Sequence, residues 1–121
     1  MANFLIVDDS STMRKIIARS LRQAGFKLDQ IHEASDGYEG LSLLASGKQV
    51  DIILSDINMP NMDGLEFVQE VQAAGYGIPI VIITTERGQD IVAQAIQLGA
   101  VKSIEKPFTP EQLRQELKGL V

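Results

Sequence analysis

Four short segments of the sequence carry side chains that could bind a metal ion or an anion, and each follows a run of apolar residues. The first is Asp8-Asp9-Ser10, directly after residues 4–7. Two carboxylates about 4 Å apart repel each other by roughly 1 kcal/mol in water and about 4 kcal/mol at an effective dielectric constant near 20. The other segments add a carboxylate, an amide, hydroxyls and an ammonium group: Asp56 and Asn58, Thr84 and Thr85, and Lys106.

A divalent cation would remove the repulsion between these carboxylates. Oxygen ligands with few protein donors suit Mg²⁺ or Mn²⁺, which keep several of their own waters. The sequence has one histidine, His32, and no cysteine, which argues strongly against a zinc site. The alternative is that Asp8 and Asp9 are only carboxylates near the start of a helix, where the helix dipole favours them. The polar groups after three other apolar runs weigh against that alternative.

The apolar runs alternate with segments patterned as amphipathic helices. Short runs rich in Ile and Val predict strands that are buried on both faces. We expect strands at residues 4–7, 31–34, 52–54, 80–83 and 101–104. Helices are predicted from apolar spacing and end signals: one through residues 13–21 before Gly25, one opened by Asp36, one opened by Asp63, one through residues 91–98 before Gly99, and one opened by Thr109.

Five strand–helix units in alternation predict one α/β domain over residues 1–121, with a parallel sheet and helices on both faces. Such sheets bind ligands outside the carboxyl ends of their strands, near the point where the strand order reverses. The polar segments are therefore expected to converge at one edge of the sheet. A cis bond between Lys106 and Pro107 would turn the lysine side chain back over the carboxylates.

The composition restricts the class of protein. The 121 residues carry a net charge of −5, which argues against non-specific binding to nucleic acid. The sequence shows no apolar run long enough to cross a membrane and no secretory signal, so no membrane attachment is expected. Together with the lack of cysteine, these features favour a cytoplasmic protein.

The motifs LIVDDS, DIILSDINMPNMDG, IITTE and EKPF occur in this order along essentially the whole chain. As a set they resemble the receiver domain of bacterial two-component response regulators, and the chain looks most like the single-domain chemotaxis regulators of the CheY type. The resemblance implies a flavodoxin-like fold with strand order 2-1-3-4-5. It also implies a signalling switch that catalyses only its own phosphorylation and dephosphorylation, and is not otherwise an enzyme.

By position, the resemblance implies that Asp56 accepts a phosphoryl group from a sensor histidine kinase. Asp9, Asp56 and the backbone carbonyl of Asn58 would bind Mg²⁺ directly, and Asp8 would act mainly through a bound water. Asn58 and Glu86 would influence how fast the aspartyl phosphate hydrolyses.

The resemblance further implies that Thr84 and Lys106 hold the phosphoryl group, with the N–H groups of Ile57 and Thr85 completing the cradle. An inward movement of Thr84 would alter the face built by the fourth helix, fifth strand and fifth helix. Receivers often carry Tyr or Phe three residues before the lysine, and this sequence has Ser103 there. The aromatic half of the usual switch is therefore missing.

The partners implied by the resemblance are the kinase, a downstream target at that face, such as the flagellar motor switch, and a phosphatase. The protein would be a monomer or a weak dimer linked to phosphorylation. A basic face on the first helix is either a solvated surface or a docking site for a kinase or phosphatase. Its residues are Arg14, Lys15, Arg19 and Arg22.

Other functions fit parts of the pattern. A Mg²⁺-dependent hydrolase with an aspartate nucleophile would need an acid or base where Asn58 stands. A flavodoxin-type carrier would place a flavin phosphate against Asp8 and Asp9, which would repel it. A receiver-like protein that acts by binding alone would not need every site residue. An intermediate or a phosphate sink in another phosphorelay would use the same residues as a chemotaxis switch.

Overall fold

The computed structural model describes residues 2–85 and 89–121, without the side chain of Gln89, so Glu86 lies outside the described residues. Strands and helices alternate strictly along the chain, as predicted. The elements are β1 (Ala2–Val7), α1 (Ser11–Gln23), β2 (Leu28–Ala34), α2 (Gly37–Ala45), β3 (Ile52–Ser55), α3 (Gly64–Ala73), β4 (Ile80–Thr84), α4 (Gln89–Leu98), β5 (Lys102–Glu105) and α5 (Pro110–Leu117).

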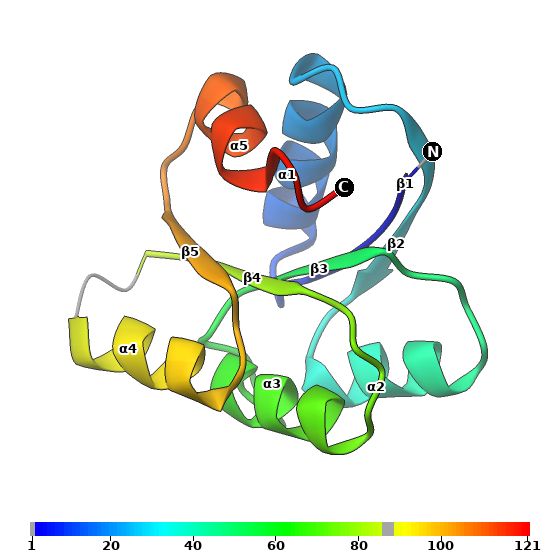
Figure 1. Ribbon diagram of the computed structural model, residues 1–121, viewed down its shortest axis with the longest axis vertical. Coiled ribbons are helices and arrows are strands. Elements are labelled where there is room, and N and C mark those ends of the chain that lie inside the picture. The colour runs from blue at the N-terminus through cyan, green and yellow to red at the C-terminus, as the bar shows by residue number, and fades with distance from the viewer. Residues whose placement is uncertain (1, 86–88) are drawn as a thin grey trace.

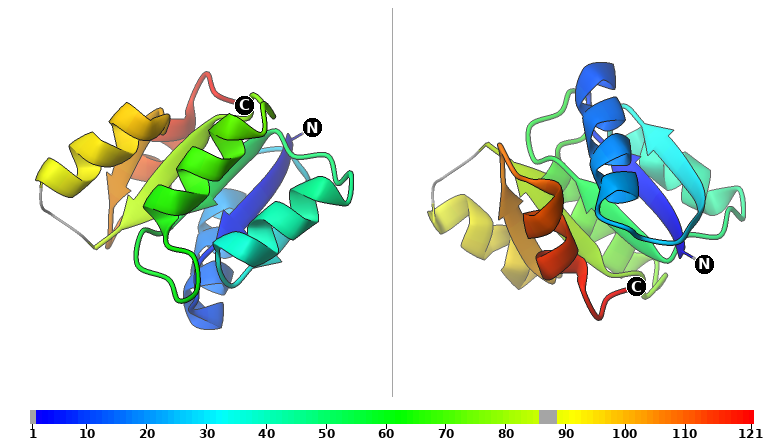
Figure 2. Two further views of the ribbon diagram at one scale, coloured as in Figure 1. Left: turned by 90° about the horizontal axis from the view of Figure 1, so that it is seen from below. Right: turned by 90° about the horizontal axis from the view of Figure 1, so that it is seen from above.

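The strands form one parallel sheet in the order β2-β1-β3-β4-β5, which confirms the predicted strand order. Helices α1 and α5 cover one face, and α2, α3 and α4 cover the other (Figure 1). The two views of Figure 2 show each helical layer from its own side. The strand order reverses at β1, which lies between β2 and β3. Residues that follow β1 and β3 therefore emerge side by side at the switch point of the sheet.

Each central strand contributes side chains to two separate cores. Along β1, Leu5 and Val7 pack with α2 and α3, whereas Phe4 and Ile6 pack with α1 and α5. All four side chains are fully buried. This alternation follows from the two-residue period of a strand, and burial on both faces explains why these runs are continuously apolar. The strand ends are consequently held from both sides.

Each strand differs from the prediction at one end or both: β1 begins at Ala2 rather than at residue 4, and β3 and β4 end one residue later, at Ser55 and Thr84. β2 begins at Leu28 rather than at residue 31, and its burial pattern mixes exposed and partly buried positions. Because β2 is an edge strand, its first residues carry no continuous apolar run that would reveal them. β5 is shifted by one residue and ends at Glu105, so Glu105 belongs to the strand and Lys106 directly follows it.

Side-chain caps begin four of the helices. The predicted caps Asp36, Asp63 and Thr109 each accept a hydrogen bond from the backbone N–H three residues later. Ser10 does the same for α1, which the sequence had not indicated. Thr109 also forms the full capping box with Gln112, because that side chain accepts from the Thr109 N–H at 2.8 Å. Across the described ranges, no helix has the length and apolar character needed to cross a membrane.

Candidate functional site

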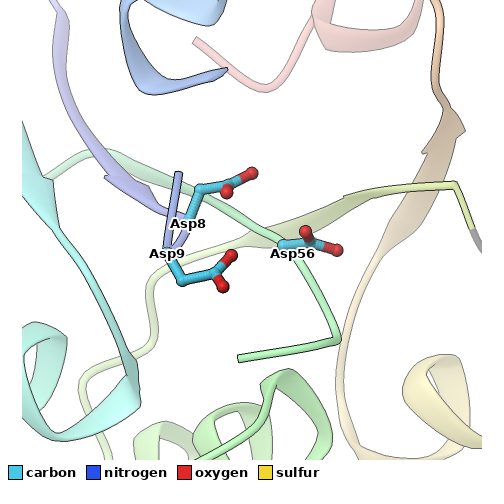
Figure 3. Close-up of side chains that lie close together, drawn as sticks. All are labelled: Asp8, Asp9 and Asp56. Carbon is cyan, nitrogen blue, oxygen red and sulfur yellow. The ribbon is translucent and has the colours of Figure 1, made fainter. Parts of the chain in front are cut away.

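Three carboxylates from two neighbouring strands meet at the switch point. Asp8 and Asp9 follow β1 and Asp56 follows β3, and Figure 3 shows the three side chains close together. One oxygen of each carboxylate lies within 4.8 Å of the others, so the group could hold a metal ion. Asp8 is buried, Asp56 is partly buried and Asp9 is exposed. The cluster is thus embedded on the Asp8 side and open to solvent on the Asp9 side.

Lys106 lies against two of these carboxylates. Its Nζ donates to Asp8 Oδ2 at 2.9 Å and to Asp56 Oδ2 at 3.2 Å, and only 8% of its side chain is exposed. The Lys106–Pro107 peptide bond is cis, and the Lys106 N–H donates to the carbonyl of Thr84. One ammonium offsets one of three negative charges, which leaves the site at about −2. A divalent cation matches that remaining charge.

Asp8 is held at both carboxylate oxygens. Oδ1 accepts from the N–H of Ser10 at 2.9 Å, Oδ2 accepts from Lys106, and the backbone N–H donates to the carbonyl of Ala34. Ser10 is the N-cap of α1, and the first turn of that helix contains no acidic residue. Asp8 and Asp9 therefore directly precede the N-cap of α1, and Asp8 also pairs with Lys106, a contact that a helix-start carboxylate does not need.

Asp56 is oriented by its own loop. Its Oδ1 accepts from the N–H of Ile57 at 2.7 Å, while Oδ2 accepts from Lys106. The loop is closed by a hydrogen bond of 2.7 Å from the Gly64 N–H to the carbonyl of Ile57. A Cβ at Gly64 would overlap the Asp56 carbonyl oxygen and lie 2.7 Å from Ile57 Cα, so only glycine fits there. This carboxylate has a defined direction and retains access to solvent.

The remaining predicted residues lie around this cluster. Asn58 is exposed and lines an open cavity together with Asp9. Thr84 is buried at the end of β4, and Thr85 follows it at the surface. Ser103 lies within β5, opposite Ile82 of β4. The strand order places these residues at or near the carboxyl end of the sheet, on the same side as the carboxylate cluster.

Sequence reasoning missed one contact of the site. Arg14 Nη1 donates to the backbone carbonyl of Asp8 at 2.6 Å, and its Nε donates to Glu33 at 2.9 Å. The sequence had placed Arg14 only on the basic face of the first helix. A signal was present, because a basic residue in a first helical turn opposes the helix dipole and calls for another explanation.

Comparison with known proteins identifies the family. Residues 4–118 match the family model of the response regulator receiver domain. The chain belongs to this family. This receiver domain is 41% identical over 119 residues to a chemotaxis protein CheY homolog from Campylobacter jejuni, with 97% of this chain and 90% of that protein covered. It is 40% identical over 116 residues to chemotaxis protein CheY1 from Helicobacter pylori, with 94% and 92% covered.

Solved structures agree with the assignment. Chemotaxis protein CheY4 of Vibrio cholerae superposes with a TM-score of 0.82 at 36% identity, covering 100% of this receiver and 99% of that chain. A CheX-CheY-BeF3-Mg complex from Borrelia burgdorferi gives 0.84 at 26% identity, covering 96% and 86%. The predicted flavodoxin-like fold of the CheY type is confirmed, and the receiver domain acts as a signalling switch.

Proposed function

We propose that this receiver accepts a phosphoryl group on Asp56 from a sensor histidine kinase in the cytoplasm, in a Mg²⁺-dependent step. The observation that carries the proposal is the arrangement of Asp8, Asp9 and Asp56 around Lys106. Three carboxylates with one ammonium create a site of net charge about −2, and one carboxylate is both oriented and accessible. Phosphoryl transfer depends mainly on such positioning and charge neutralisation.

The residues present fit Mg²⁺, and also Mn²⁺, because all candidate donors are oxygen atoms. Asp9, Asp56 and the carbonyl of Asn58 are proposed to hold the ion, with Asp8 acting through a water. When bound, the ion supplies positive charge that offsets repulsion between the Asp56 carboxylate and an incoming phosphoryl group. Lys106 supplies a second positive charge from the buried side of the cluster.

In the proposed reaction an Asp56 oxygen forms a bond to phosphorus while the bond between phosphorus and the kinase histidine nitrogen breaks. The freed histidine then takes up a proton from water. Lys106 is proposed to pair with a phosphoryl oxygen, which its position beside Asp56 Oδ2 allows. The hydroxyl of Thr84 and the N–H groups of Ile57 and Thr85 complete the set of donors. Hydrolysis of the acyl phosphate, tuned by Asn58 and Glu86, would reset the site.

The output is proposed to be a shift between two arrangements of the domain. A phosphoryl group adds charge and acceptor oxygens beside Thr84, at the end of β4. The face built by α4, β5 and α5 would then change its affinity for a target. Because Ser103 replaces an aromatic ring, the response is expected to depend on Thr84 and on the backbone around it.

The pathway is proposed from the relatives. Two curated relatives at 40% identity or above are chemotaxis proteins, which favours a role in chemotaxis. The structural relative solved as a CheX-CheY complex supports a further protein partner, such as a phosphatase. A role as a relay intermediate or phosphate sink uses the same site, and only identification of the cognate kinase and target separates these roles.

The test is incubation with Mg²⁺ and acetyl phosphate, followed by measurement of the intact mass. We expect one added phosphoryl group in the wild type and in Asp29→Asn, a control at an exposed carboxylate of β2. We expect none in Asp56→Asn. Phosphate release over many turnovers without an adduct would instead support a hydrolase. If the protein shows neither a phosphoryl adduct nor turnover, the result would support a domain that acts by binding alone.

A further inference from the structure

We propose that Arg14 is a positioning residue for the metal site, and that it acts by holding the peptide between Asp8 and Asp9. The inference deepens the proposed function and rests on it, since it concerns the same site. Arg14 would touch neither the ion nor the phosphoryl group. Glu33 is proposed to fix the direction of its guanidinium.

The contacts place Arg14 behind the site. Nη1 donates to the Asp8 carbonyl oxygen at 2.6 Å, and Nε donates to Glu33 Oε1 at 2.9 Å. The guanidinium therefore bridges the end of β1 and the edge strand β2 from the first turn of α1. Only 17% of the Arg14 side chain is exposed, against 44% for Glu33. A short hydrogen bond from a charged donor is among the stronger kinds in proteins.

The location of this arginine is electrostatically unfavourable with respect to the helix dipole. It lies in the first turn of α1, where the helix dipole disfavours a positive charge, and that turn contains no acidic residue to offset it. The neighbouring carboxylates attract the guanidinium, whereas a cation bound among them would repel it. Glu33 compensates part of the charge. An arginine at this position is best explained by the contacts that its fixed guanidinium makes.

Asp9 is the group that needs this support. Asp8 and Asp56 each have both carboxylate oxygens engaged by hydrogen bonds. The side chain of Asp9 is exposed and makes no hydrogen bond or ion pair with another described residue. No contact with a described residue fixes the carboxylate, so its position depends on the backbone that carries it. Arg14 holds the carbonyl of the peptide that leads into Asp9, and so limits rotation of that peptide.

Arginine suits this task better than lysine. Its planar fork presents separate N–H donors to two partners on different strands, whereas an ammonium is a compact point charge. Arg14→Lys keeps the positive charge near the cluster, so any loss of Mg²⁺ affinity reports geometry rather than charge. Outer groups that orient metal ligands typically contribute tenfold to hundredfold in metal affinity.

The experiment measures Mg²⁺ affinity by isothermal titration calorimetry, without a phosphodonor. We expect Arg14→Lys to bind Mg²⁺ roughly tenfold more weakly than wild type. Arg114→Lys, the same change at an exposed arginine of α5, should bind within about twofold of wild type. Glu33→Ala should weaken binding in the same direction as Arg14→Lys. In NMR spectra, the Asp9 and Ser10 amide signals should move in Arg14→Lys and stay in place in Arg114→Lys.

Equal Mg²⁺ affinity in folded Arg14→Lys and Arg114→Lys would overturn the inference. If a thermal unfolding experiment shows that Arg14→Lys is not folded, the Glu33→Ala variant decides the question. A Mg²⁺ affinity unchanged from wild type in Glu33→Ala would then overturn the inference. The proposed function can be refuted independently of this inference. A wild type that binds Mg²⁺ but takes no phosphoryl group on Asp56 would refute phosphorylation, while the ratio of Mg²⁺ affinities would still test Arg14.

Discussion

Substitution of Asp9 by asparagine should change the free energy of unfolding in opposite directions with and without Mg²⁺. The carboxylate is exposed and makes no stabilising contact with another described residue, but it lies within 4.8 Å of two other carboxylates. In the metal-free protein the two neighbouring carboxylates therefore repel its charge, and Lys106 offsets only part of that repulsion. Asparagine keeps the size of the side chain and removes the charge.

The magnitude follows from these separations. At 4.8 Å, two unit charges repel by about 0.9 kcal/mol in water and about 3.5 kcal/mol at an effective dielectric constant of 20. Exposure places Asp9 near the lower limit, so Asp8 and Asp56 together repel it by about 2 kcal/mol. Lys106 contacts both of these carboxylates, and one positive charge against two negative charges offsets about half of the repulsion. We expect Asp9→Asn to be more stable than wild type by about 1 kcal/mol without metal.

Mg²⁺ should reverse the order. A ligand present at one hundred times its dissociation constant stabilises the folded state by about 2.7 kcal/mol. Asp9→Asn lacks one proposed ligand and should gain far less. With excess Mg²⁺, wild type should therefore exceed the variant by up to about 1.7 kcal/mol, the difference between that gain and the repulsion removed.

Urea unfolding monitored by circular dichroism, in EDTA and in excess Mg²⁺, gives the four free energies. Asp29→Asn is the matched control and should respond to Mg²⁺ like wild type. A variant that is less stable than wild type in EDTA would refute the electrostatic reasoning. An equal gain from Mg²⁺ in wild type and Asp9→Asn would refute the assignment of Asp9 as a ligand.

Two other predictions concern neighbouring parts of the structure. Gly64→Ala should lower the free energy of unfolding by about 1–3 kcal/mol and slow phosphorylation of Asp56, because the new Cβ would overlap the Asp56 carbonyl and crowd Ile57. A hydrogen bond from the Asn61 amide, followed by one from the Glu39 N–H, holds the pKa of Asp36 below its ordinary value. The stability from Asp36 is present above pH about 4 and is lost as the pH falls through its lowered pKa.

Each of these predictions has a comparison variant. Gly75 has open space around it but a φ of +74°, so Gly75→Ala should also lower the free energy of unfolding, through backbone strain, yet leave the rate of phosphorylation unchanged. An equal loss of rate in both variants would contradict the steric argument. For the pH dependence, urea unfolding of wild type and Asp36→Asn should differ most above pH 5 and converge toward pH 3. A difference in the free energy of unfolding that grows as the pH falls would contradict the predicted direction of the pH dependence.

Much of the architecture was predictable because it is encoded locally. Continuous apolar runs reflect burial on both sheet faces, and Thr109 with Pro110 marks a helix start within a few residues. Alternation of strands and helices places every strand-end residue at one edge. The start of the edge strand β2 was not predicted, because its first residues include exposed positions and form no continuous apolar run.

For the site, the sequence by itself determined which chemical groups lie at the carboxyl end of the sheet. Only the tertiary structure decided how they are paired. Lys106 reaches Asp8 across 98 residues of sequence and Asp56 across 50, and Arg14 meets Glu33 on another strand. Such contacts depend on strand order and on which side chains are buried. Residue types and short-range periodicity do not encode that information, because it arises only when distant segments pack together.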